Sequence, residues 1–145
     1  MAKPEVAYLR TKLKTATPEE LTIITFDVLI NSTTRSIALL KNPVLDVQTI
    51  HNELRRAQRA AALLMGSLRF EIDNDLARNI FRIYEYWHHE LFMANMRKSA
   101  DVIEQVLPQM KYYRKTWAEA NRRYRMEKIS AVPLQQSGGG FVAVG

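Results

Sequence analysis

The chain of 145 residues is long enough for one domain with one hydrophobic core, and its 47% hydrophobic content excludes a protein that is disordered throughout. It contains no cysteine, which excludes a disulfide framework and any thiolate metal site and indicates a reducing compartment. The net charge of +6 lies near the ends: residues 1–16 carry +3 and residues 111–128 carry +5, whereas residues 17–110 carry −2.

Residues 1–16 are predicted to form a mobile N-terminal arm. The aromatic Tyr8 stands among charged residues there, and we expect at most one short helical turn. A helix should begin at Thr17, because Thr17 is a good N-cap, Pro18 suits the first helical position and Glu20 completes a capping box. This first helix is expected to continue to about residue 40, where Asn42-Pro43 ends it.

The apolar residues of the first helix fall on two stripes, which is more than one buried face needs. The second predicted helix, at about residues 47–69, has one tidy seam with coiled-coil-like spacing. The third, at about residues 75–97, again carries a second apolar stripe beside its core stripe. The stripes of the first helix are Leu21, Ile24 and Val28, and Ile23, Phe26, Ile30 and Ile37; the seam of the second is Val47, Ile50, Leu54, Ala57, Ala61, Leu64 and Leu68; those of the third are Leu76, Ile80, Ile83, Trp87, Leu91 and Ala94, and Ala77, Phe81, Tyr84, His88 and Phe92.

Ser99 is expected to cap a fourth helix, which Pro108 should kink because proline removes one backbone donor. Its pattern stops at Ser130, and residues 130–145, with three consecutive glycines, are predicted to be a disordered tail. Four helices joined by short loops pack most simply as an antiparallel up-down bundle. The predicted organisation is therefore an all-α, four-helix bundle at residues 17–129 between the arm and the tail.

Sequence motifs give no support to catalysis or to a bound metal or cofactor. No phosphate-binding loop, nucleophile elbow or paired metal-binding motif is present. The adjacent His88 and His89 point about 100° apart on a helix and do not readily share a metal. No apolar run of about 18 residues and no secretory signal are present, so we expect a cytoplasmic protein without a membrane span.

Nucleic-acid binding is the alternative that the charge suggests. Arg122, Arg123 and Arg125 surround Tyr124 and could contact phosphates. Basic residues at a helix C-terminus also favour the helix dipole, and no recognition helix accompanies the cluster. We therefore favour a protein without nucleic-acid binding.

Several segments resemble the FliS family, the flagellin-specific export chaperones. Residues 15–21 (TATPEEL) resemble the family's Thr-Ala-Ser-Pro-Glu-Glu-Leu, and Phe26-Asp27 stands where the family has Tyr-Asp. Residues 79–86 (NIFRIYEY) and 91–97 (LFMANMR) are similar to its third-helix motifs, and Trp117 matches a fourth-helix Trp. The ordered set covers about residues 7 to 120.

This resemblance implies a chaperone that binds the disordered C-terminal region of flagellin, prevents premature polymerisation and delivers it to the flagellar type III export apparatus. Export-gate components and a co-chaperone are further candidate partners. It also implies that the arm covers part of the binding surface when no client is bound. From the surplus apolar stripes we predict a partner-binding groove lined by Tyr8, Phe26, Ile30, Leu63, Phe81, Tyr84, His88 and Phe92.

Overall fold

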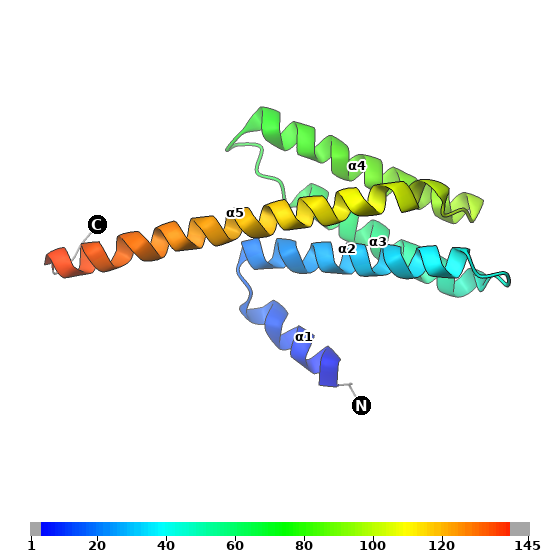
Figure 1. Cartoon of the computed structure of the whole chain (residues 1–145), viewed down its shortest axis with the longest axis horizontal. Coiled ribbons are helices and arrows are strands. Elements are labelled where there is room, and N and C mark those ends of the chain that lie inside the picture. Colours follow the sequence, from blue (N-terminus) through cyan, green and yellow to red (C-terminus); the bar gives the residue numbers. More distant parts are fainter. Residues whose placement is uncertain (1–3, 140–145) are drawn as a thin grey trace. The chain divides into compact units, whose positions relative to one another are not determined.

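The computed structural model describes residues 4–139, and the described chain is helical apart from short connections (Figure 1). Its helices are α1 (Pro4–Thr15), α2 (Pro18–Leu40), α3 (Val47–Gly66), α4 (Asn74–Arg97) and α5 (Asp101–Gly139). The chain divides into two compact units, Met1–Arg114 and Lys115–Gly145, with the boundary inside α5. The predicted all-α class is confirmed, with α2, α3, α4 and residues 101–114 of α5 as the helices of an up-down bundle.

The start of α2 follows the predicted capping box. The hydroxyl of Thr17 accepts a hydrogen bond from the backbone N–H of Glu20 at 3.2 Å, and the Glu20 carboxylate accepts from the Thr17 N–H at 3.4 Å. Pro18 occupies the first turn, where its missing N–H costs nothing. The helix ends at Leu40, as expected from the following Asn42-Pro43.

Aspartates begin the next two helices. The side chain of Asp46 accepts from the N–H of Thr49 at 3.1 Å, and that of Asp73 accepts from the N–H of Leu76 at 3.0 Å. Each thereby satisfies a backbone donor that the first helical turn leaves unpaired. At the other end of α4, Lys98 adopts the left-handed conformation with φ of 51° and closes the helix through its N–H to the Ala94 carbonyl.

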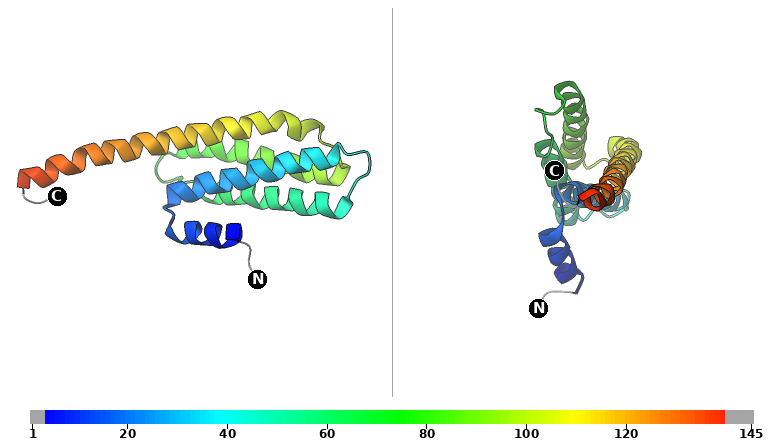
Figure 2. Two further views of the ribbon diagram at one scale, coloured as in Figure 1. Left: turned by 60° about the horizontal axis from the view of Figure 1, so that its bottom comes forward. Right: turned by 90° about the vertical axis from the view of Figure 1, so that its left-hand side faces the viewer.

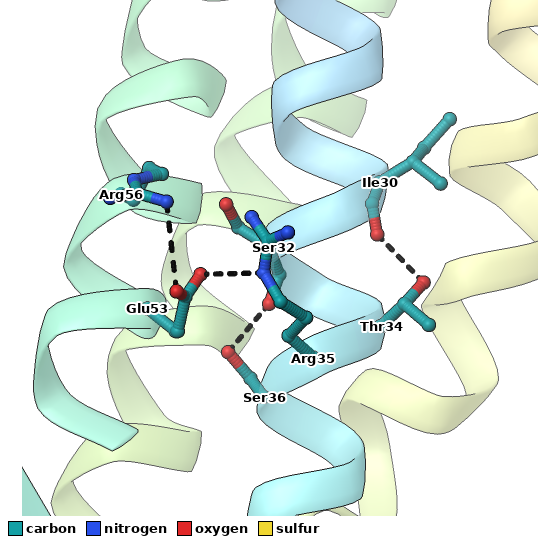
Figure 3. Close-up of polar contacts among 7 residues, drawn as sticks. All are labelled: Ile30, Ser32, Thr34, Arg35, Ser36, Glu53 and Arg56. Atoms are coloured by element: carbon teal, nitrogen blue, oxygen red, sulfur yellow. Dashed lines mark hydrogen bonds and ion pairs between the residues drawn. The ribbon is translucent and has the colours of Figure 1, made fainter. Parts of the chain in front are cut away.

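The helix α3 packs along both α2 and α4, and the left view of Figure 2 shows its ribbon beside that of α2. A hydrogen-bonded ion pair links α2 to α3, from Arg35 Nε to Glu53 Oε1 at 3.3 Å, and Arg56 approaches the same carboxylate at 3.6 Å (Figure 3). Towards α5, Arg114 donates to Asp27 at 2.6 Å, within the first compact unit.

Small side chains allow α2 and α3 to approach closely. Ser32 and Ser36 are buried on α2, and the Ser36 hydroxyl donates to the Ser32 carbonyl at 2.7 Å (Figure 3). Three alanines are buried on α3: Ala57, Ala60 and Ala61. Close-packed interiors leave few voids, so large side chains from elsewhere must fill the space beside these small residues.

Aromatic side chains from α2 and α4 form one cluster in the core. The rings of Tyr84 and Trp87 lie 5.4 Å apart, and Phe26 of α2 meets them edge-on at 6.1 and 6.4 Å. The Trp87 indole N–H donates to Gln109 Oε1 of α5 at 3.1 Å, so its polar atom is satisfied. The remaining fully buried large side chains surround this cluster: Leu29, Ile50, Leu54, Leu64, Leu91, Ile103, Val106 and Met110.

The core differs from the predicted stripes mainly on α4. Leu76, predicted as its first core residue, is 56% exposed, whereas Ala77 and Tyr84 from the second stripe are buried. On α3 the predicted seam is confirmed from Ile50 to Leu64, but Val47 is exposed. These differences arise because α4 has two apolar stripes and its neighbours decide which one is covered.

The N-terminal segment is more helical than predicted. The expectation of at most one helical turn was wrong, because α1 is a helix of 12 residues. It contains many good helix formers, and the hydroxyls of Thr11 and Thr15 bond to carbonyls four residues earlier. At the other end, α5 runs as one helix through Pro108 and continues past Ser130 to Gly139, so the helix ends later than predicted. Residues 140–145 of the predicted tail lie outside the described residues.

One helix is long and apolar enough to cross a membrane by length and composition. This helix is α2, with a mean hydropathy of 1.3 over its best window, and no other described helix meets the test. A helix in the middle of a bundle has the same composition. In this structure α2 packs along α3, its apolar side chains Ile24, Phe26 and Leu29 are buried, and 33% of the window lies inside the protein.

Candidate partner-binding surface

The boundary between α3 and α4 has a defined register. The His51 Nδ1 and Asn95 Nδ2 atoms are hydrogen-bonded at 3.0 Å near one end of the pair, and the rings of Phe70 and Phe81 lie 6.0 Å apart near the other. The two helices therefore run antiparallel, and the side of α4 that carries Asn95 adjoins α3.

Four side chains continue along that side of α4. Relative to Phe81, the positions of His88, Phe92 and Met96 are seven, eleven and fifteen residues later, which keeps them on one side of a helix. Phe81 and His88 are half-buried, and Phe92 and Met96 are exposed. We call these four residues the α4 strip. Three of the eight predicted site residues, Phe81, His88 and Phe92, belong to the α4 strip. The fourth member, Met96, lies four residues after Phe92 and could have been predicted from that spacing.

Two of the predicted residues belong instead to the core. Phe26 is 0% and Tyr84 is 1% exposed, so neither offers surface to a partner in this structure. The prediction that both lie on a surplus, outward stripe is corrected. Their rings pack against each other and against Trp87 in the core, although both stand beside the predicted core stripes.

The other three predicted residues lie apart from the α4 strip. Ile30 is half-buried and points towards α5 (Figure 3), on the side of α2 where Asp27 binds Arg114. Leu63 is 66% exposed on α3, four residues after Arg59 in the row that starts at His51, and it is about 120° around the helix from His51. Tyr8 on α1 is 69% exposed. The structure thus does not bring all eight together.

Among the described residues no group of three or more His, Asp or Glu side chains is placed to hold a metal ion. Hydrogen bonds from Thr49 lower the pKa of the exposed Asp46 carboxylate at the start of α3, and a hydrogen bond from Arg69 lowers that of Glu71. Glu71 directly follows Phe70, whose ring packs against Phe81 of the α4 strip.

The model of the family described as Flagellar protein FliS matches residues 1–124. The chain belongs to the FliS family. A curated FliS relative, the flagellar secretion chaperone FliS of Bacillus subtilis (strain 168), is 23% identical over 125 residues, covering 86% of this chain and 91% of the relative. The FliS match includes α1 to α4 and the first part of α5, and therefore the whole α4 strip. Family and relative together indicate a flagellar secretion chaperone.

Proposed function

We propose that this FliS protein is a cytoplasmic export chaperone for flagellin. It binds the disordered C-terminal segment of flagellin, prevents its premature polymerisation and delivers it to the flagellar type III export apparatus. The observation that carries the proposal is the α4 strip, in which the exposed Phe92 and Met96 continue the line of the half-buried Phe81 and His88. Exposed apolar surface of this kind usually marks a partner site.

The α4 strip suits an amphipathic segment better than a folded domain. It is one helix face wide and runs from Phe81 to Met96, about 22 Å at about 1.5 Å per residue. A helix laid along it would place its own apolar residues, spaced three and four apart, against the exposed side chains. A client that is disordered before binding loses conformational entropy, so its affinity per unit area is reduced.

Of the eight residues predicted from the sequence, Phe81, His88 and Phe92 remain the proposed contacts, now with Met96. Phe26 and Tyr84 support the site from the core. Ile30, Leu63 and Tyr8 stay candidates for a client that extends beyond the α4 strip, because a long flexible segment can follow several faces of the bundle.

Co-purification with a peptide of the flagellin C-terminal segment tests the proposal. The full chain, carrying an affinity tag, should retain this peptide, and a flagellin peptide from the middle of the sequence serves as the control. Equal retention of both peptides, or of neither, would contradict the proposed function.

A further inference from the structure

Arginines without partners border the α4 strip. Arg55 and Arg59 on α3, and Arg78 and Arg82 on α4, are exposed and take part in none of the ion pairs or hydrogen bonds found in residues 4–139. Arg35, Arg56, Arg69 and Arg114 form ion pairs with carboxylates, whereas Arg97 at the end of α4 forms none in the described chain. We call Arg55, Arg59, Arg78 and Arg82 the arginine flank.

The positions of the arginine flank follow from the register of α3 and α4. His51 contacts Asn95 of α4, and Arg55 and Arg59 follow His51 at successive turns of α3, each turned slightly outward. On α4, Arg78 and Arg82 lie on the outer side of the α4 strip, near Phe81, which is the first residue of the strip. One row therefore lies on α3 and the other on α4, with the apolar side chains of the α4 strip beside them.

This arrangement is unfavourable in the free protein. Each row contains two like charges spaced i, i+4, which repel each other and slightly destabilise the helix. Two exposed carboxylates stand near the arginines of α4: Asp75, and Glu85, which lies four residues after Phe81 on the face of the α4 strip itself. Neither forms an ion pair with the flank in the described chain. Four arginines against two carboxylates leave the border of an apolar strip positively charged.

We propose that the α4 strip and the arginine flank together bind an amphipathic helix whose apolar face is bordered by carboxylates. This inference rests on the proposed function and specifies the client: the flagellin segment supplies such a helix. A helix about 10 Å wide, lying over the strip, reaches both rows of arginines. Acidic residues beside its apolar face then neutralise charges that the free chaperone leaves uncompensated. The complex accordingly depends on salt more than an apolar contact alone.

Two designed peptides of about 18 residues test the charge requirement, a length that covers the strip. Both carry the same Leu face at helical spacing, and the flanking positions are Glu in one and Lys in the other. The full chain should bind the Glu peptide about tenfold more tightly at low salt, and the difference should shrink at high salt. The double variant Arg55→Glu with Arg59→Glu should weaken the Glu peptide about tenfold and strengthen the Lys peptide.

The matched control is Arg122→Glu with Arg123→Glu, which changes the net charge equally but lies in the second compact unit. It should leave the preference for the Glu peptide intact. Equal affinity for both peptides, or an equal loss in the control variant, overturns the inference. A duplex oligonucleotide that displaces the Glu peptide at the same affinity also overturns it, in favour of nucleic acid.

The flagellin C-terminal peptide separates this inference from the proposed function. If the wild-type chain binds the Glu peptide and not the flagellin peptide, the proposed function fails and the acidic-helix site stands. If it binds the flagellin peptide and the Arg55→Glu, Arg59→Glu variant binds it equally well, the proposed function stands and the inference fails. Circular dichroism of each variant confirms that these exposed substitutions leave the helices formed.

Discussion

Replacing Phe92 by Ala should weaken binding of the flagellin C-terminal peptide about thirtyfold. Phe92 is 46% exposed in the free protein, and a fully buried aromatic side chain removes about 150–250 Å² from water. A partner that covers the exposed part would bury about 90 Å² more, which at about 25 cal/mol per Å² contributes about 2 kcal/mol. That free energy corresponds to roughly a thirtyfold change in Kd.

The same helix offers a matched control. Tyr86 is also 46% exposed but lies six residues earlier, about 120° around α4 from Phe92 and off the α4 strip. Replacing Tyr86 by Ala removes a similar area of aromatic surface and should change Kd less than threefold, on the order of 0.5 kcal/mol. Isothermal titration calorimetry of both variants with the peptide measures the two constants under one set of conditions.

The stability of the variants must be measured with their affinity. Chemical denaturation separates a lost contact from a partly unfolded chaperone, because a stable variant with weak binding has lost surface and not structure. Equal Kd values for Phe92→Ala and the wild type would refute the assignment of the α4 strip. Equal losses for Phe92→Ala and Tyr86→Ala would show that the client does not distinguish the two faces of α4.

Four further outcomes are expected. Tyr84→Ala should reduce the free energy of unfolding by about 3–5 kcal/mol in chemical denaturation, because Tyr84 is in the core; a stable variant with weak client binding would restore the original surface assignment. Thr33→Val should raise it by about 1 kcal/mol, since the buried Thr33 hydroxyl finds no hydrogen-bond partner in the described chain; no gain over the exposed control Thr34→Val would contradict this. Hydrogen bonds from Thr49 lower the Asp46 pKa from 3.8, so the carboxylate stabilises the fold above pH 3.8, and this stability is lost as the pH falls through the lowered pKa. In denaturation measured at a series of acidic pH values, Asp46→Asn should flatten the dependence of the free energy of unfolding on pH in this range. An unchanged dependence would refute this reasoning. Deletion of residues 1–14 should raise client affinity in calorimetry if the arm competes for the surface, whereas a large loss would make the arm part of the binding site.

Local chemistry was sufficient to place most helix boundaries. The capping box of Thr17 and Glu20 and the stop at Asn42-Pro43 involve residues within one turn of one another, so their outcome depends little on the rest of the chain. The single seam of α3 was also predictable from Ile50 to Leu64, because one narrow apolar stripe can face only one way. The length of α1 was missed because helix formers without an apolar stripe give a weak signal.

The candidate site was only partly predictable. The α4 strip shares one helical face, and the spacing that grouped Phe81, His88 and Phe92 also included Tyr84, which the structure buries. The arginine flank could not be recognised as a border, because Arg55 and Arg78 are brought to one surface by the pairing of α3 with α4. The sequence shows that these residues are charged, but it does not show that few carboxylates lie near them in the folded chain.

The sequence by itself determined an all-helical chain, its main boundaries and the surplus of apolar residues on α2 and α4. Only the tertiary structure decided which part of that surplus is core and which is surface. A helix that is apolar on two sides has no unique inward face, so its neighbours select one. Here the rings of Phe26, Tyr84 and Trp87 pack together in the core, and Phe92 remains 46% exposed, where a partner can reach it.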